Sequence, residues 1–360
     1  MSVGRFGAVR ASVAAPVRVA RRRALFARVG GQLRSLGEPE QRPLRSLASA
    51  RIAGIGCAVP ERVLSSAAVA ERLGVDERWI VTRTGVRQRH VAAESDTLAD
   101  LAARAARAAL ADAELEPGEV DLVVVATMAA DELTPNAAPL VADAIGAPGA
   151  GAFDVGAACT GFLSALALAA AMVEAGRARQ AVVVGADILS RLHDPADRST
   201  AALFADGAGA AVVVPPRAGG AEIGPILLSS EADRERIIRA SHDDRFIRMQ
   251  GHDTFRTAVR RMSEVTLAAA ERAGLALDEI DLFVYHQANA RILRAVAERL
   301  DLDERRVVEA IDRYGNTSSA TIPIALCDAR RRGLLRSGAN VLLAAFGAGF
   351  TWGAGVVRWE

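Results

Sequence analysis

The 360-residue chain contains no lysine, so all 44 of its Lys and Arg positions are arginine. Mechanisms that need a lysine, as a Schiff-base partner or as a general base, are therefore excluded. Cysteine is also scarce, because Cys57, Cys159 and Cys327 are the only three and lack the spacing of metal ligands. Neither a disulfide framework nor a metal site is indicated, and we expect a reducing compartment, the cytoplasm.

Long apolar runs are missing too. The run from Leu163 to Met172 soon meets Glu174 and Arg177, short of the roughly 18 apolar residues that suggest a membrane span. Since 51% of the residues are hydrophobic, the chain has enough apolar material for a large buried core. We therefore expect a soluble globular protein without a membrane span.

Charge is distributed unevenly along the chain. Residues 1–50 carry ten arginines against Glu38 and Glu40, a net +8, which leaves −7 for residues 51–360 because the whole chain is +1. A segment rich in Arg and without a periodic apolar face predicts a disordered basic extension over residues 1–50. A transit peptide or an upstream in-frame stretch has the same composition. Without interleaved aromatic residues, nucleic-acid binding is not indicated.

The remaining chain repeats itself. The stretch Glu119–Val125 is echoed by Glu279–Tyr285, and Ala181–Gly185 by Val341–Ala345, both at an offset of 160 residues. Continuous apolar runs of this kind are typical of strands in a central sheet. We therefore predict an internal duplication with halves 51–218 and 219–360, in a layered α/β fold with pseudo-twofold symmetry.

A cysteine lies at the predicted junction of a strand and a helix. The turn Gly156–Phe162, which contains Cys159, separates the strand-like Ala152–Val155 from the apolar run that starts at Leu163. The free N–H groups and the dipole of a helix N-terminus favour a thiolate, so we expect a lowered thiol pKa. The plainer alternative is a small cysteine buried in a core helix.

Three later stretches point to the same chemistry. His286 to Asn289 follow a predicted buried strand, and Gly315 to Ser318 correspond to the cysteine turn by the repeat. A neutral His286 and the amide of Asn316 can each donate an N–H to a thioester oxygen while a thiolate attacks carbonyl carbon. The glycines of 346–353 allow a backbone N–H near the ligand. Taken singly, these stretches are equally consistent with a structural histidine, an ordinary turn and a glycine hairpin.

Six stretches together resemble the 3-oxoacyl-(acyl-carrier-protein) synthases of the third type. They are Trp79–Gly85, Ala157–Gly161, Asp194–Arg198, His286–Asn289, Gly315–Ser318 and Phe346–Gly353. The resemblance covers residues 51–360 and implies the thiolase fold, with two halves in a five-layer α-β-α-β-α arrangement. It also implies an initiating condensing enzyme that joins an acyl-CoA to malonyl-acyl-carrier-protein through a cysteine thioester.

The resemblance assigns a role to each matching position. Cys159 would be the acylated nucleophile, with His286 and Asn316 acting on the malonyl donor. The backbone N–H groups of Cys159 and Ala348 would form the oxyanion hole, although Ala348 stands where many relatives have glycine. Coenzyme A would enter as a thioester substrate, not as a cofactor. It would be held by Trp79, Arg83 and Arg198.

The acyl channel and the partners are also implied by the resemblance. Thr134 and Phe204 would border the channel. Thr134 replaces the bulky aromatic of relatives restricted to short starters, so we expect starters longer than acetyl. An acidic carrier protein would dock on Arg256, Arg291 and Arg299, and the enzyme would be a homodimer.

Two other functions stay open. One is a specialised homologue of secondary metabolism that uses an unusual starter or acts as an acyltransferase. The other is a non-catalytic paired subunit, which Cys159 argues against. Elongating relatives resemble a Cys-His-His arrangement with an added lysine, whereas this chain has Asn316 and no lysine.

Overall fold

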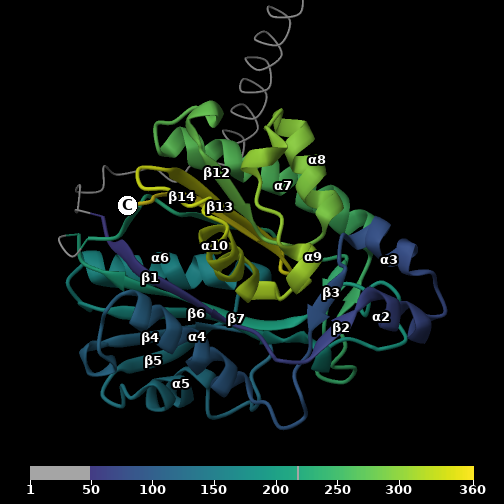
Figure 1. Ribbon diagram of the computed structural model, residues 1–360, viewed down its shortest axis with the longest axis horizontal. Helices are drawn as coiled ribbons and strands as arrows, with labels where there is room; N and C mark the ends of the chain where they lie inside the picture. Colours follow the sequence, from purple (N-terminus) through teal and green to yellow (C-terminus); the bar gives the residue numbers. More distant parts are fainter. Residues whose placement is uncertain (1–48, 217–218) are drawn as a thin grey trace, which may run out of the picture. The chain divides into compact units, whose positions relative to one another are not determined.

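The structure, a computed structural model, describes residues 49–216 and 219–360 (Figure 1). The predicted basic extension over residues 1–50 therefore lies almost wholly outside the described residues. The predicted division between residues 218 and 219 stays a prediction. Among the described residues, no helix combines the length and apolar character needed to cross a membrane.

The first half forms a five-stranded array in the order β1-β7-β6-β4-β5. Its strands are β1 (Arg51–Ala58), β4 (Leu122–Ala126), β5 (Gly151–Val155), β6 (Ala181–Ile188) and β7 (Asp206–Val214). Strands β4, β5 and β6 run parallel, and β7 pairs antiparallel with both β6 and β1. Every residue of β4, β6 and β7 is buried, as their unbroken apolar runs require.

The second half repeats the central part of this array. It contains β12 (Leu282–Tyr285), β13 (Asn340–Gly347), β14 (Thr351–Arg358) and β9 (Leu227–Ser230). As in β4-β6-β7, the first pair is parallel and the second antiparallel. Where the first half has β5, the second half has one isolated bridge between Phe283 and Val307.

The two arrays are joined at one end. The three-residue strand β8 (Ala221–Ile223) pairs with β1 through two residue pairs and with β14 through another two. Hydrogen bonding therefore links all strands of both arrays into one sheet of ten strands, where two separate sheets were expected. The difference is local, because β8 touches only the ends of its neighbours.

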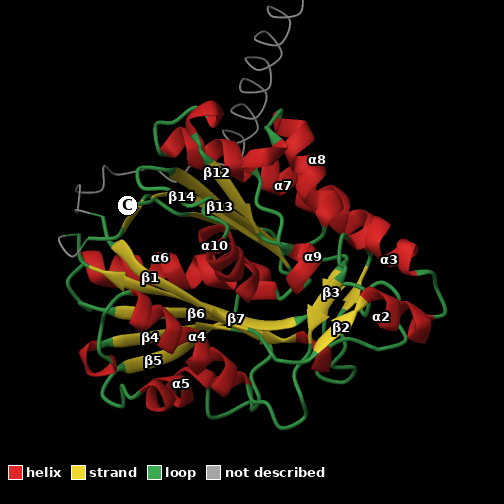
Figure 2. Ribbon diagram, viewed as in Figure 1, coloured by secondary structure: helices red, strands yellow, loops and turns green. Residues whose placement is uncertain are grey.

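Helices lie between and outside the two arrays (Figures 1 and 2). The outer helices beside the first array are α4 (Leu98–Asp112) and α5 (Ala137–Ile145), and those beside the second are α7 (Gly251–Arg272) and α8 (Ala290–Leu300). Helices α6 (Gly161–Glu174) and α10 (Thr321–Arg331) fill the middle layer and contact strands of both arrays. This arrangement confirms the predicted thiolase fold with its α-β-α-β-α layers.

Smaller elements border one end of the layered body. They are β2 (Val63–Ser65), α2 (Ser66–Leu73), α3 (Glu77–Thr84), β3 (Gln88–His90), β10 (Ile238–Arg239), β11 (Arg248–Met249) and α9 (Ile311–Tyr314). Asp76 caps α3 by accepting from the backbone N–H of Arg78, and Gly85 ends it in the left-handed conformation. This helix carries Trp79 and Arg83 at the same end of the molecule as α8 (Figure 1).

The offset of 160 residues also holds between the two helices of the middle layer. Helix α6 follows the short turn η2 (Ala158–Thr160), and α10 follows η6 (Ser318–Ala320). Ala158 and Ser318 both have positive φ values, 45° and 51°. The cysteine turn and the asparagine turn are therefore equivalent structures, and they contact each other at the centre of the molecule.

Candidate active site

One cavity of about 650 Å³ opens at the meeting point of the two turns. Both halves contribute to its walls. Of the residues singled out from the sequence, it brings together Cys159, His286, Asn316, Ala348, Trp79, Arg83, Arg198, Phe204 and Arg291. Its inner end is formed by buried His286 and Asn316, which are 3% and 4% exposed.

Cys159 is a neutral thiol in this environment. Burial raises its pKa to about 12, and the negative charge of Asp187 acts in the same direction. A hydrogen bond from the Ser318 side chain opposes the rise without cancelling it. The lowered pKa expected from the helix N-terminus is therefore wrong, because removal of the thiol from water outweighs the favourable backbone groups.

His286 is a neutral imidazole. It follows β12, where its backbone N–H donates to Ala344 O at 2.8 Å. Burial lowers the pKa of the ring to about 3, so it carries one N–H at physiological pH. Its Nδ1 lies 2.6 Å from Thr321 Oγ1.

The Asn316 amide is oriented by the turn that contains it. Its Oδ1 accepts from the backbone N–H of Ser318 at 2.9 Å, and its Nδ2 donates to Ala288 O at 3.3 Å. Leu203 O and the backbone N–H of Ala205 hold its peptide groups at 3.0 and 2.9 Å. The amide nitrogen is thereby fixed on the side that lines the cavity.

Two buried polar side chains that support the site were missed in the sequence. Gln287 uses its whole carboxamide, since Nε2 donates to Tyr285 O and Val308 O, while Oε1 accepts from the backbone of residues 310 and 311. Gln287 lies within the stretch His286–Asn289, in which the sequence indicated a role for His286 alone. Its bonds fix the loop that carries His286.

Asp187 is the second missed residue. Its carboxylate accepts from the side chain of Thr127 at 3.1 Å and from the backbone N–H of Met128 at 2.9 Å. It also accepts from the backbone and hydroxyl of Ser319 at 3.1 and 2.7 Å. An acidic residue at the end of a buried strand was the available signal. Asp187 therefore ties β6 of the first half to the asparagine turn of the second.

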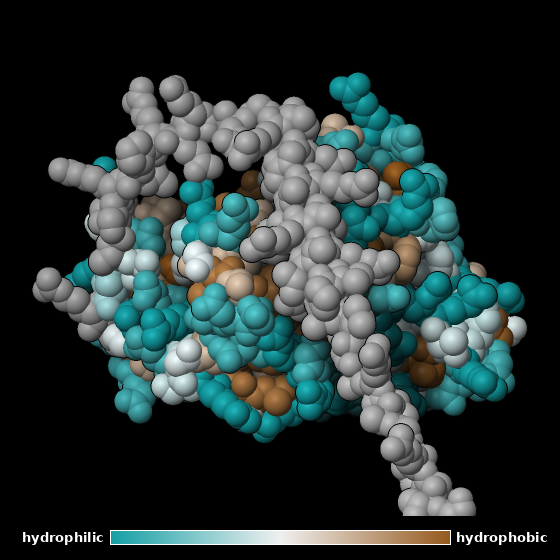
Figure 3. Space-filling view, turned by 90° about the horizontal axis from the view of Figure 1, so that it is seen from above, coloured by the Kyte–Doolittle hydropathy of each residue, from teal (hydrophilic) through white to brown (hydrophobic). Residues whose placement is uncertain are grey.

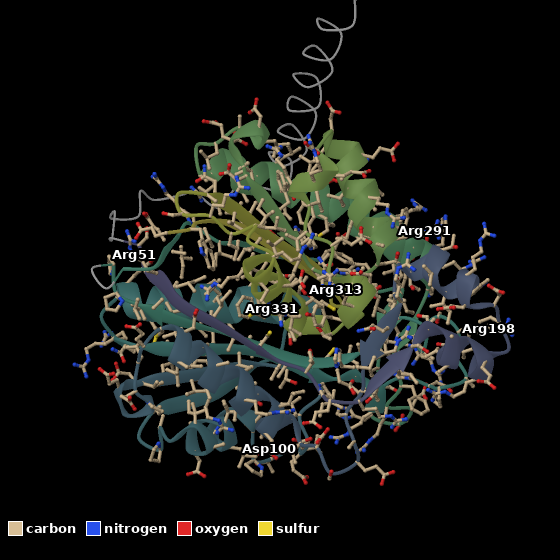
Figure 4. The ribbon with its side chains drawn as sticks, viewed as in Figure 1. Arg51, Asp100, Arg198, Arg291, Arg313 and Arg331 are labelled. Atoms are coloured by element: carbon tan, nitrogen blue, oxygen red, sulfur yellow. The ribbon has the colours of Figure 1, made fainter. Side chains whose placement is uncertain are left out.

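The cavity mouth is aromatic and basic. The guanidinium carbon of Arg83 lies 4.8 Å from the centre of the Trp79 ring, and Asn289 Nδ2 donates to Arg83 O at 3.0 Å. Arg198 and Arg291 are exposed and lie on the same side of the molecule (Figure 4). This mouth suits a ligand with an aromatic base and phosphates.

The glycine segment near the C-terminus packs directly on Cys159. A Cβ placed on Gly347 would lie 2.8 Å from the backbone nitrogen of Cys159 and 3.2 Å from its Cβ. Thr351 Oγ1 lies 2.8 Å from Thr160 Oγ1 and fixes the following strand to the same turn. Only a glycine at 347 therefore permits this approach, and the next residue, Ala348, lines the cavity.

Other predicted site residues lie outside this cavity. Thr134 is exposed, so its part in an acyl channel is not seen within one chain and stays a prediction. Arg256 and Arg299 are exposed on α7 and α8, and Arg256 is paired with Asp253 at 3.7 Å. Among the described residues, no group of three or more His, Cys, Asp and Glu side chains is arranged to hold a metal ion.

A cysteine thiol, an imidazole and an amide that line one cavity at the centre of a five-layer fold are the arrangement of a thiolase-fold condensing enzyme. Family models of 3-oxoacyl-[acyl-carrier-protein] synthase III match residues 153–232, and residues 270–359 for its C-terminal part. The first range contains Cys159, and the second contains His286 and Asn316. The chain belongs to the 3-oxoacyl-[acyl-carrier-protein] synthase III family, whose members are condensing acyltransferases.

Curated relatives and solved structures agree with this assignment. The beta-ketoacyl-[acyl-carrier-protein] synthase III of Rhodospirillum rubrum is 44% identical over 85% of this chain and 98% of its own. The crystal structure of the Pseudomonas aeruginosa 3-oxoacyl-(acyl carrier protein) synthase III has a TM-score of 0.83 and 44% identity, covering 87% of this chain and 98% of that one. The priming beta-ketosynthase of the R1128 polyketide pathway has a TM-score of 0.83 and 35% identity, covering 89% and 99%.

The close approach of Gly347 to Cys159 yields a prediction. Gly347→Ala should lower the rate of acyl transfer by about 100-fold, because the new methyl group displaces the backbone of Cys159. A displacement of up to roughly 1 Å is enough for a loss of this size. Gly149→Ala is the matched control, since a Cβ there meets nothing within 4 Å. Steady-state rates of both variants, with melting temperatures, provide the measurement. Wild-type turnover in Gly347→Ala would contradict the role of this contact.

Proposed function

We propose that this chain catalyses an initiating decarboxylative condensation, in which an acyl-CoA starter and malonyl-acyl-carrier-protein give 3-oxoacyl-acyl-carrier-protein. The observation that carries the proposal is the convergence of Cys159, His286 and Asn316 on one cavity, in a chain 44% identical to a beta-ketoacyl-[acyl-carrier-protein] synthase III over 98% of that relative. Coenzyme A enters as part of a substrate, and the reaction needs no cofactor.

In the first half-reaction, Cys159 Sγ attacks the thioester carbonyl of the acyl-CoA. The thiol is neutral at rest, so it gives up its proton as the S–C bond forms, and coenzyme A leaves as a thiol. The backbone N–H groups of Cys159 and Ala348 stabilise the tetrahedral oxyanion. The Ser318 side chain acts to lower the pKa of the thiol and so favours its ionised form during attack.

In the second half-reaction, His286 and Asn316 act on the malonyl thioester. Each donates one N–H to the thioester oxygen and so stabilises the enolate that forms when carbon dioxide leaves. The enolate carbon attacks the carbonyl carbon of the acyl-cysteine, a C–C bond forms and the C–S bond breaks, and the Cys159 thiolate takes up a proton from solvent to return to the thiol. A neutral imidazole suits this role because its N–H is retained without a full charge in a buried site.

The cavity mouth supports the proposed binding of both substrates. Trp79 offers a ring for adenine, and Arg83 and Arg198 lie where phosphates pass. Arg291 is exposed at the cavity edge on α8, with its guanidinium carbon 5.6 Å from the centre of the Phe255 ring. We propose this basic mouth as the docking site of the acidic carrier. On the face seen in Figure 3, hydrophilic residues predominate, with hydrophobic residues in separate patches.

We further propose a homodimer. Strand β5 lies at the end of the sheet, so one of its edges has no pairing strand within residues 49–216 and 219–360. Leu140, which is 42% exposed, lies on α5, a helix that contacts β5, and Leu133, which is 87% exposed, lies in the loop before α5. Pairing of β5 with a second copy would cover these residues and bring Thr134 toward the cavity of the partner subunit.

The division of labour between the two half-reactions is testable with three variants. Cys159→Ser should abolish acylation by a radiolabelled acyl-CoA. His286→Ala and Asn316→Ala should acylate normally and lose condensation by about 100-fold or more, since each removes an N–H donor to the enolate oxygen. Trapping of labelled enzyme measures the first step, and release of carbon dioxide measures the second. Condensation at the wild-type rate by Asn316→Ala would rule out the proposed chemistry.

Carrier docking is testable by reversal of one charge. Arg291→Glu should raise KM for malonyl-acyl-carrier-protein by about tenfold and leave the acyl-CoA half-reaction unchanged, because an acidic partner meets a like charge. Arg104→Glu, exposed on α4 on the opposite outer layer, is the matched control. Equal damage to both half-reactions would assign Arg291 to coenzyme A binding or to folding instead.

A second candidate function is priming of a polyketide chain, which the likeness to the R1128 priming ketosynthase favours. The preferred acyl-CoA starter distinguishes the two functions.

We expect kcat/KM to rise from acetyl-CoA to longer acyl-CoA starters, since Thr134 leaves the channel open and each buried CH₂ contributes roughly 0.8 kcal/mol. Thr134→Phe should restore preference for acetyl-CoA. A wild type that prefers acetyl-CoA would contradict the expectation.

A further inference from the structure

The imidazole of His286 has one hydrogen-bonding side chain beside it in the described part of the chain. Thr321, the first residue of α10, is 2% exposed, and its Oγ1 lies 2.6 Å from His286 Nδ1. Because burial keeps the ring neutral, only one of its nitrogens carries a proton. The hydrogen bond at Nδ1 therefore decides which nitrogen that is.

The Thr321 hydroxyl has two acceptors within reach and one hydrogen. One acceptor is His286 Nδ1, and the other is Ser318 O at 3.0 Å. Ser318 O already accepts the backbone N–H of Thr321, so it does not depend on the hydroxyl. Nδ1 has no other donor among the described residues, and it is the nearer acceptor.

The duplication shows that this contact is specific to the second half. At the offset of 160 residues, His286 corresponds to Ala126, and Thr321 corresponds to Gly161. In the first half the same two positions pack together without polar side chains, since a Cβ on Gly161 would lie 3.0 Å from that of Ala126. A methyl group packs against a glycine in the first half, and an imidazole contacts a hydroxyl at the equivalent positions of the second half.

We propose that the Thr321 hydroxyl donates its hydrogen to His286 Nδ1 and so holds the proton of the ring on Nε2. Thr321 is then a positioning residue for decarboxylation, an inference that rests on the proposed function. With the proton on Nε2, the ring presents a donor to the malonyl thioester oxygen beside the amide of Asn316. With the proton on Nδ1, a lone pair would face the enolate oxygen and oppose its charge.

The experiment compares Thr321→Val, which keeps the shape and removes the hydroxyl, with Thr321→Ser, which keeps the hydroxyl. Thr317→Val is the matched control, because Thr317 is equally buried in the adjacent turn and its hydroxyl has no partner among the described residues. Enzyme that is first acylated and then mixed with malonyl-acyl-carrier-protein reports the second half-reaction alone. Melting temperatures are measured for all three variants.

We expect Thr321→Val to lose decarboxylation by about 10-fold to 100-fold while its acylation rate is unchanged. Thr321→Ser should recover most of the loss, and Thr317→Val should behave as the wild type. In the ring-nitrogen NMR spectrum of the wild type, assigned against His286→Asn, Nε2 should be protonated and Nδ1 bare. This spectrum needs no variant at Thr321, so misfolding of Thr321→Val does not leave the proposal untested.

A proton on Nδ1 in the wild type, or full condensation by Thr321→Val, would overturn the inference. Asn316→Ala, measured in parallel, separates this failure from failure of the proposed function. If Asn316→Ala loses decarboxylation and Thr321→Val does not, only the role of Thr321 is wrong. If both variants condense normally, the proposed function itself is wrong.

Discussion

The carboxylate of Asp187 is the contact on which the geometry of the site depends. It accepts hydrogen bonds from Thr127 and Met128 in the first half and from Ser319 in the second. Burial raises the pKa of this group, and the bonds from Met128 and Ser319 oppose the rise. A buried acid so fully bonded fixes its neighbours closely. It thereby sets the position of the asparagine turn relative to the strands that lead to Cys159.

Burial has opposite consequences for the pKa values of half-buried Cys159 and buried His286. Water exclusion disfavours charge, so it keeps the thiol of Cys159 protonated and the ring of His286 unprotonated. Both shifts favour the uncharged form of the residue. In the proposed mechanism, Cys159 would therefore ionise only when a substrate carbonyl and its oxyanion donors are in place.

Much of the fold followed from the sequence because the repeat is carried by strong local patterns. The apolar runs at 119–125 and 279–285 predicted buried strands, and the offset of 160 predicted which turns correspond. The link through β8 was missed, since three residues carry no detectable pattern. The pKa of Cys159 was wrongly predicted because desolvation arises from packing of distant segments. The contacts of Asp187 and Thr321 escaped for the same reason, as each joins side chains far apart in the chain.

The two edge strands of the sheet differ in whether their outer edge is free to pair with another strand. In the part of the chain that the structure describes, β12 at one end has only the bridge from Phe283 to Val307 beyond it, and β5 at the other end has an edge without a partner strand. An edge that pairs with its own copy about a twofold axis is used up by that pairing. In the homodimer proposed above, assembly through this edge would stop at two chains, because the second half does not repeat β5. Loss of symmetry within one chain thus limits the symmetry that several chains can build.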